Sequence, residues 1–416
     1  MRILKLTPAV ENRLLAARVA HDARAQAVAA RIVADVRKHG DGALLAWARK
    51  LDHPSIRARD LWISQKEIRA AERNVSPDFL RAIRHAARNI RRVAEKQLPR
   101  SWSLEVEPGV LISQRVVPIE CIGAYIPGGH ASLVSTLLMI AVPAQVSKVP
   151  SVVAVCPRPN NELLAAANFL GLREVARIGG AQAIAALAYG TKSISRVEKI
   201  FGPGNKYVNA AKQLVSADCA IDLPAGPTEA IVLAERGNAR YIAADLLAQA
   251  EHAKDAASYF VTTSPILARQ VQRELKRQLD ELPVGITDYS TVRSGAILVS
   301  NSLEGACEFV NRFAPEHLSL PSDSTELLQQ VRAAGTIFLG SWAAQPLGDY
   351  ISGSNHVLPT AGWARRRGGL SAADFVKCIS AQTISRKGFF RLADSAETFA
   401  EAEGLLAHCN AVRIRR

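Results

Sequence analysis

Two side chains that can bind a metal ion share one face of a predicted helix. The stretch DLLAQAEH (245–252) has a helical composition and places Gln249 and His252 three positions apart. Positions i and i+3 lie on the same face of a helix. Two interpretations are open: an ordinary solvated polar face, or part of a metal site in which His252 is a common type of ligand and Gln249 a rare one.

Other residues with suitable donor atoms follow further along the chain. In APEHL, Glu316 and His317 are adjacent after a proline, and a Glu and a His together are suitable general bases if a loop directs both at one substrate. Taken singly, such residues are more often structural than functional. Four of the candidates offer nitrogen and oxygen donors without a thiolate, a set that suits zinc or manganese: Gln249, His252, Asp349 and His408.

Two predicted strand-to-helix turns are rich in glycine, at 179–180 and at 202–205. Such turns let the backbone approach a phosphate group at a helix N-terminus, and ligands of α/β proteins bind at the carboxyl ends of strands. Neither turn matches the pattern GxGxxG, so ordinary sheet-to-helix turn chemistry is the alternative for each. Their position at successive strand ends favours a nucleotide site.

Segments typical of strands and of helices alternate through most of the chain. Residues 1–100 are mostly amphipathic helix, with a short strand candidate at 61–64. Strand and helix then alternate from about 125 to 232 and again to about 342, and the chain is helical after about 370. Helices of this length between strands predict parallel sheets. We therefore predict an α/β fold with two sheets and helical extensions at both ends.

Composition and charge favour a cytoplasmic protein with neither a nucleic acid nor a membrane as partner. The 416 residues are 48% hydrophobic and 22% charged, with a formal net charge of +14. Six scattered cysteines without a CxxC fit a reducing compartment, and no apolar run has the length of a signal peptide or a bilayer span. The clearest basic cluster has the spacing of a solvated helix face and lacks interleaved aromatic residues: Arg81, Arg84, Arg88, Arg91, Arg92 and Lys96.

Eight stretches follow one another in the order and spacing of a known enzyme family. They are YIPGG, GGAQAIAALAYGT, FGPGN, DLPAGPTE, DLLAQAEH, APEHL, GDYISGSNHVLPT and AEGLLAHCNAV. From about residue 20 to its end the sequence resembles bacterial histidinol dehydrogenases. The resemblance implies oxidation of L-histidinol to L-histidine through L-histidinaldehyde, with two NAD+ and one zinc ion per subunit.

The same resemblance implies two incomplete Rossmann-like domains, similar to aldehyde dehydrogenases, in a homodimer with shared active sites. The first domain, with the metal and catalytic residues, is expected at 25–124 plus 233–370. The second, on the NAD side, is expected at 125–232. Residues 1–24 would form an N-terminal helical arm, and residues 371–416 a tail that exchanges between the subunits.

Roles for individual residues are likewise implied by the resemblance. His317 would take the alcohol proton as hydride leaves for NAD, and Glu316 would activate the water that attacks the aldehyde. Gln249, His252 and Asp349 would bind zinc from one subunit and His408 from its partner. The substrate contacts would be Thr228, Gln249, His252, His317, Asp349, His356, Glu403 and His408, with Ser135 assisting, and the NAD contacts Tyr125, Gln182 and Asn205.

One position departs from the family pattern. After PAGP, family members commonly have Ser where this sequence has Thr228, which keeps the hydroxyl and adds a methyl group. A related enzyme that oxidises another small primary alcohol, such as a sulfonated diol, is therefore one alternative. Glu403 and His356 favour a substrate with an amine and an imidazole. A non-catalytic binding protein on the same scaffold is the alternative from another class.

Overall fold

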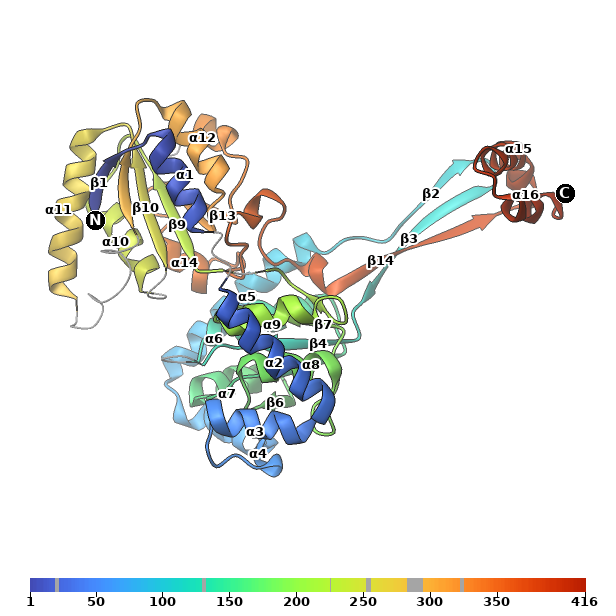
Figure 1. The fold of residues 1–416 in the computed structure, drawn as a ribbon, viewed down its shortest axis with the longest axis horizontal. Coiled ribbons are helices and arrows are strands. Elements are labelled where there is room, and N and C mark those ends of the chain that lie inside the picture. Colours follow the sequence, from blue (N-terminus) through green and yellow to red (C-terminus); the bar gives the residue numbers. More distant parts are fainter. Residues whose placement is uncertain (19–21, 129–131, 225, 252–255, 283–294, 322–324) are drawn as a thin grey trace.

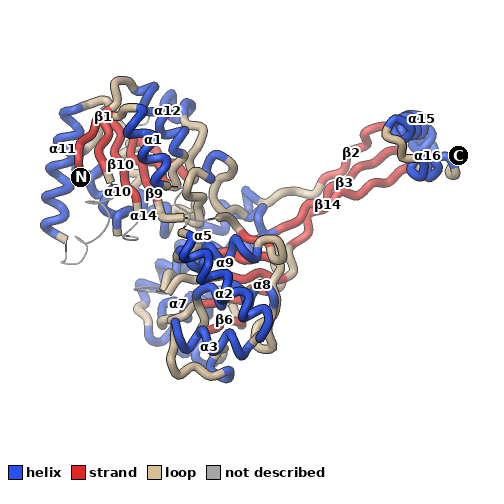
Figure 2. The backbone as a smooth tube through the Cα atoms, viewed as in Figure 1, coloured by secondary structure: helices blue, strands red, loops and turns tan. Residues whose placement is uncertain are grey.

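Two parallel sheets and a projecting three-stranded ribbon make up the architecture of the chain (Figure 1; Figure 2 shows the strands in red). The computed structural model describes residues 1–18, 22–128, 132–224, 226–251, 256–282, 295–321 and 325–416. The predicted α/β class is confirmed. Among the helices that the structure describes, none is long and apolar enough to cross a membrane.

The first sheet has the strand order β1-β11-β10-β9-β12-β13, and all of its pairs are parallel. Its strands are β1 (Arg2–Lys5), β9 (Glu229–Leu233), β10 (Ala257–Thr262), β11 (Ala296–Val299), β12 (His317–Leu320) and β13 (Thr336–Leu339). Its helices are α1 (Pro8–Ala17), α10 (Ala239–Ala250), α11 (Pro265–Glu281), α12 (Leu303–Phe313), α13 (Thr325–Gln330) and α14 (Gln345–Tyr350). Helices α1 and α12 pack on one face and α10 and α11 on the other, so β9 is buried on both sides, as parallel strands usually are.

The second sheet has the strand order β6-β5-β4-β7-β8, and all of its pairs are parallel. From β4 the chain first adds β5 and β6 on one side and then β7 and β8 on the other. Its strands are β4 (Cys121–Tyr125), β5 (Ser151–Val155), β6 (Glu174–Ala176), β7 (Lys199–Phe201) and β8 (Ala220–Ile221). One face carries α4 (Gln65–Ala71), α5 (Pro77–Gln97), α6 (Val134–Val146) and α7 (Asn161–Phe169). The other carries α2 (Ala23–His39), α3 (Asp41–Leu51), α8 (Gly180–Tyr189) and α9 (Lys206–Val215). The carboxyl ends of β4 and β7 form the switch point where such sheets bind ligands.

The antiparallel ribbon extends away from both sheets and carries the C-terminal helices at its tip (Figure 1). Its order is β14-β3-β2, and the elements are β2 (Trp102–Glu107), β3 (Val110–Pro118), β14 (Val376–Ile384), α15 (Arg386–Ala402) and α16 (Leu406–Arg413). Short 3₁₀ helices complete the fold at Ala58–Asp60, Glu72–Asn74, Trp363–Arg365 and Ala372–Phe375.

The structure divides the chain differently from the predicted domains. Helices α2 to α5 and strand β4, all within 25–124 or at its end, pack in the second sheet's layers and not with 233–370. Strand β9 starts inside 125–232 but is central to the first sheet, and β1 makes the N-terminal arm an edge strand. The tail after 370 contains the strand β14 after a short 3₁₀ helix, and 61–64 forms only a bridge at Trp62. An apolar helix face fits either sheet, so the pattern alone could not assign the helices.

A buried ion pair holds the glycine-rich turn after β7. The ammonium group of Lys212 donates to Asp222 and, at 2.8 Å, to the carbonyl of Gly202, while Asp222 Oδ2 accepts from the Gly202 amide at 2.7 Å. Gly202 has a φ of +117°, and a Cβ there would lie 2.1 Å from the carbonyl oxygen of Tyr125. Only glycine fits this close approach of β7 to β4, and the ion pair keeps the turn in place.

We predict that Lys212→Met lowers the free energy of unfolding by about 3–5 kcal/mol, because it leaves the Asp222 carboxylate buried without a partner. Lys212→Met/Asp222→Asn removes both charges and should recover part of the loss. Chemical denaturation measures both variants. A Lys212→Met midpoint equal to that of the wild type would contradict this account of the turn.

A half-buried carboxylate joins α10 to α14. Asp245 lies one helical turn before Gln249 and accepts a hydrogen bond from the backbone N–H of Gln345, the first residue of α14. Burial raises the pKa of Asp245 to about 6, although that hydrogen bond acts in the opposite direction. Because protonation is easier in the folded chain, Asp245 adds stability at low pH, and this contribution is lost as the pH rises through about 6.

We therefore predict that Asp245→Asn, which cannot ionise, becomes more stable relative to the wild type as the pH rises. Between about pH 4 and about pH 7.5 the difference in unfolding free energy should grow by about 2 kcal/mol in the variant's favour. Thermal unfolding of zinc-free protein across this range measures it. Parallel stability profiles for the two proteins would show that Asp245 does not titrate in this way.

Candidate active site

The carboxylate of Glu316 is fixed by two donors at the start of β9. The Thr228 hydroxyl and the backbone N–H of Glu229, the latter at 3.0 Å, both donate to Glu316 Oε2. The Thr228 hydroxyl in turn accepts from the side-chain amide of Gln249 near the end of α10. A chain of hydrogen bonds therefore links the predicted metal ligand Gln249 to the predicted base Glu316.

His317 is buried at the start of β12, and each of its ring nitrogens faces a carboxylate. Its Nδ1 lies 3.8 Å from Glu316 Oε2, and its Nε2 lies 3.4 Å from Asp349 Oδ1 on α14. Neither nitrogen makes a hydrogen bond to any residue that the structure describes. The ring stacks on Phe338 of β13, with centroids 5.9 Å apart. A buried imidazole that is held by stacking and makes no hydrogen bond within the described residues can still bond to a ligand.

The pKa values of the two catalytic candidates are both raised, for different reasons. Burial raises the pKa of Glu316, even though His317 and the Thr228 and Glu229 donors favour its charged form. For His317, burial by itself lowers the pKa, but the nearby carboxylates of Glu316 and Asp349 outweigh it, and the net shift is upward. Neighbouring groups whose pKa values are both shifted by burial and by nearby charges are typical of sites of acid–base chemistry.

His356 connects the two sheets beside Asp349. Its Nδ1 lies 2.7 Å from the Asp349 carbonyl oxygen, and its Nε2 lies 3.2 Å from the Thr136 hydroxyl on α6. A carbonyl oxygen can only accept, so Nδ1 carries the proton and Nε2 accepts from Thr136. The predicted assisting residue, Ser135, is the half-buried neighbour of Thr136 on α6. His356 is therefore where the first sheet's site meets the second sheet.

The predicted metal set is only partly assembled within one chain. Gln249 is buried, and because its amide nitrogen donates to Thr228, its oxygen is the atom left to face a cation. His252 lies outside the described residues. Glu403, at the end of α15, and His408, on α16, are exposed at the tip of the ribbon, far from the rest of the site (Figure 1). Within the described ranges, no group of three or more His, Cys, Asp or Glu could hold a metal ion. The nitrogen and oxygen donors fit zinc only if His252 and a second subunit complete them.

The predicted NAD contacts lie near the switch point of the second sheet. Gln182 on α8 is buried, and its Oε1 has no hydrogen-bond partner in the described part of the chain, so it can accept from a ligand hydroxyl. The Tyr125 hydroxyl, at the end of β4, accepts from the Gly180 amide at 3.1 Å, and burial raises the pKa of Tyr125. Asn205 caps the start of α9 through its side chain.

One of the two glycine-rich turns is already occupied by protein groups. Asp52, after α3, accepts from the Gly179 amide at 3.2 Å and from Gln182 Nε2 at 2.9 Å. Burial raises the pKa of Asp52, against the effect of these two donors. The amides at 179–180 therefore bind a carboxylate and a hydroxyl of the chain, and a phosphate group would have to displace them.

Three residues of this region escaped the sequence analysis, and the reasons differ. Glu229 directly follows Thr228 in a quoted motif, so its position was a usable signal. Arg18 contacts the Glu229 carboxylate from an alanine-rich helix that carries no motif, and Asp52 follows an ordinary amphipathic helix. Only the folded chain brings these two to the site.

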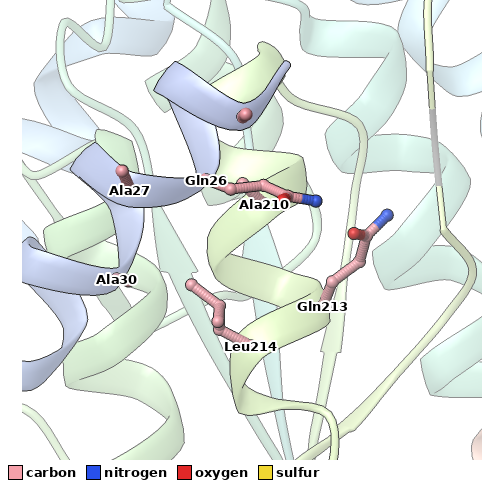
Figure 3. Close-up of a pocket in the computed structure, with 7 residues that line it drawn as sticks. Gln26, Ala27, Ala30, Ala210, Gln213 and Leu214 are labelled. Atoms are coloured by element: carbon pink, nitrogen blue, oxygen red, sulfur yellow. The ribbon is translucent and has the colours of Figure 1, made fainter. Parts of the chain in front are cut away.

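An open hollow of about 430 Å³ lies between α2 and α9, away from the catalytic candidates (Figure 3). Its lining contains no charged group: Ala23, Gln26, Ala27, Ala30, Ala210, Gln213 and Leu214. Because these side chains offer neither a base nor a nucleophile, the hollow is not a second reaction site.

Comparison with known proteins agrees with the motifs. A family model described as histidinol dehydrogenase matches residues 16–416. The histidinol dehydrogenase of Vibrio parahaemolyticus is 44% identical over 403 residues, covering 95% of this chain and 93% of that protein. That of Aquifex aeolicus is 43% identical over 388 residues, covering 92% and 91%.

A solved structure gives the same result. The crystal structure of histidinol dehydrogenase from Elizabethkingia anophelis superposes with a TM-score of 0.93 at 36% identity, covering 100% of this chain and 98% of that one. The resemblance first drawn from eight motifs is therefore confirmed. The chain belongs to the histidinol dehydrogenase family.

Proposed function

We propose that this chain oxidises L-histidinol to L-histidine through L-histidinaldehyde, with two NAD+ and one zinc ion per subunit, in the cytoplasm. The main support for this function is the arrangement of Glu316 and His317. One is a buried carboxylate anchored by two donors, and the other is a buried imidazole between two carboxylates that makes no hydrogen bond within the described chain. Two titratable groups with different surroundings can serve two successive proton transfers.

In the first step His317 takes the proton of the substrate hydroxyl as hydride leaves the same carbon, which becomes an aldehyde. The carboxylates of Glu316 and Asp349 beside the ring favour the protonated imidazole that results. NAD accepts the hydride in this step and in the next. The unpaired Oε1 of Gln182 supports a dinucleotide on the second sheet, since ribose hydroxyls are donors.

In the second step Glu316 takes a proton from the water that attacks the aldehyde, and hydride again leaves the carbon to give the acid. Both anchoring donors bind Oε2, so Oε1 is the oxygen directed to the water. No cysteine nucleophile is needed for this route. The pKa of Glu316, raised by burial, makes its ionised form a stronger base than an exposed glutamate.

The metal would be held by Gln249, His252 and Asp349 with His408 of the partner subunit, and it would orient the imidazole and amine of the substrate. The Thr228 hydroxyl donates to Glu316 and accepts from Gln249. Replacing Ser by Thr therefore preserves both hydrogen bonds and adds only a methyl group. Among the residues that the structure describes, no contact favours a sulfonated diol over histidinol.

A homodimer would bring the tail to the site. The ribbon and its helices carry exposed apolar side chains that one chain leaves uncovered: Trp102, Leu104, Val106, Ile379, Phe399, Leu406 and Ile414. Tyr350, the neighbour of Asp349 on α14, is 58% exposed, so the site has an apolar side chain beside it that one chain leaves uncovered. Exposed apolar surface of this extent marks an interface. From the tip of the ribbon, Glu403 and His408 cannot reach the site of their own chain. They therefore fit the site of a second copy of the chain.

We predict that the two catalytic residues separate the two steps. His317→Asn should slow oxidation of L-histidinol about 10²–10⁴-fold, because the alcohol loses its base. Glu316→Gln should slow oxidation of L-histidinaldehyde by at least about 10²-fold and make the aldehyde accumulate. Stopped-flow measurement of NADH with each substrate tests this.

Zinc content measured on the same two variants is the control, and it should match that of the wild type. A Glu316→Gln enzyme that converts histidinol to histidine at the normal rate would exclude Glu316 as the water-activating base. A fully active His317→Asn enzyme would exclude the other assignment.

We also predict complementation between subunits. His408→Ala and His317→Asn homodimers should each be nearly inactive, the first with lowered zinc content. Co-expression with two tags yields heterodimers in which one of the two sites is intact. A statistical mixture should regain about a quarter of wild-type activity if the sites are shared. No recovery in purified heterodimers would show that each site lies within one subunit.

A further inference from the structure

A buried arginine from the N-terminal segment lies against the catalytic region. Arg18 directly follows α1, and its guanidinium group binds both carboxylate oxygens of Glu229, with Nε 2.6 Å from Oε1. The two side chains are only 7% and 4% exposed. Their pairing is bidentate, so it fixes direction as well as distance.

The same guanidinium group holds the end of α12. It donates to the carbonyl oxygens of Phe313 and Ala314, and its carbon lies 3.7 Å from the centre of the Phe313 ring. These carbonyls form the negative end of the helix, where a cation is favoured. Ala314 has a left-handed backbone, with a φ of +51°, and precedes Glu316 by two residues. The strained turn into the catalytic pair is thus held from one side by Arg18.

Arg18 therefore contacts the two segments that a catalytic hydrogen bond joins, the start of β9 and the end of α12. Glu229 supplies the backbone N–H that binds Glu316 Oε2, and Phe313 and Ala314 lead directly into Glu316. We propose that Arg18 is a positioning residue that sets the separation between β9 and the end of α12, and so places the Glu316 carboxylate. This inference rests on the proposed function, because it assigns Arg18 to the step that Glu316 serves.

Stability alone gives no reason for this arrangement. A buried ion pair loses most of its Coulombic gain to desolvation, and an apolar pair of similar volume would fill the space as well. A lysine would offer a single ammonium group, whereas the guanidinium fork reaches the carboxylate and two carbonyls at once. The negative charge of Glu229 also raises the pKa of Glu316, and Arg18 offsets that charge.

The test uses full-length enzyme with three variants. Arg18→Met/Glu229→Gln removes both charges, so no unpaired ion is left in the core. Arg18→Lys keeps the charge and loses the fork. Glu11→Gln/Arg312→Met is the matched control, because Glu11 and Arg312 also pair α1 with α12 but make no contact with Glu229 or Glu316.

We expect kcat for L-histidinaldehyde to fall about 10–100-fold in Arg18→Met/Glu229→Gln, with KM within about threefold, because a displaced carboxylate loses its alignment. Oxidation of L-histidinol should fall less, so the ratio of the two kcat values changes. The ratio of the two kcat values in Arg18→Lys should lie between the ratios of this variant and of the wild type. The control should keep the wild-type ratio whatever its melting temperature.

An unchanged ratio in a folded Arg18→Met/Glu229→Gln enzyme would overturn the inference. If that variant does not fold, Arg18→Lys with the wild-type ratio would overturn it equally. Wild-type protein that oxidises neither compound would overturn the proposed function, and the inference with it. An altered ratio in the control would also count against it, since any loosening of α1 would then suffice.

Discussion

The burial of the Glu316 carboxylate is the constraint on which the rest of the site depends. A charged group in this position is costly unless donors meet it, and the donors are the Thr228 hydroxyl and the Glu229 N–H. Both lie at the start of β9, so that strand must be held in register with the turn into β12. Arg18 binds both elements from outside the sheet, and Gln249 continues the chain of hydrogen bonds toward the proposed metal.

The two sheets contribute opposite ends to one region. In the first sheet the catalytic candidates stand at the amino ends of β9 and β12, whereas the second sheet offers the carboxyl ends of β4 and β7. His356 touches Asp349 on one side and Thr136 on the other, and so marks the junction. A substrate held by the first sheet can therefore meet a dinucleotide held by the second, as hydride transfer requires.

The sequence predicted local chemistry better than long-range packing. The helix with Gln249, the alternating strands and helices, and the adjacency of Glu316 and His317 all follow from short-range pattern. Strand β14 was missed in the tail predicted to be helical, because its pairing partner β3 lies more than two hundred residues earlier. Arg18 and Asp52 reach the site only through tertiary packing, which periodicity does not encode. For the same reason, spacing could not show that Glu403 and His408 stand apart from their own chain's site.

The reaction proposed for this site is a four-electron oxidation that requires the metal. The most direct measurement is the number of NADH molecules formed per L-histidinol consumed, in zinc-loaded protein and in protein stripped by a chelator. The account predicts two NADH per substrate, lost on stripping and restored by zinc. One NADH per substrate with aldehyde as the final product, or full activity in stripped protein, would contradict it.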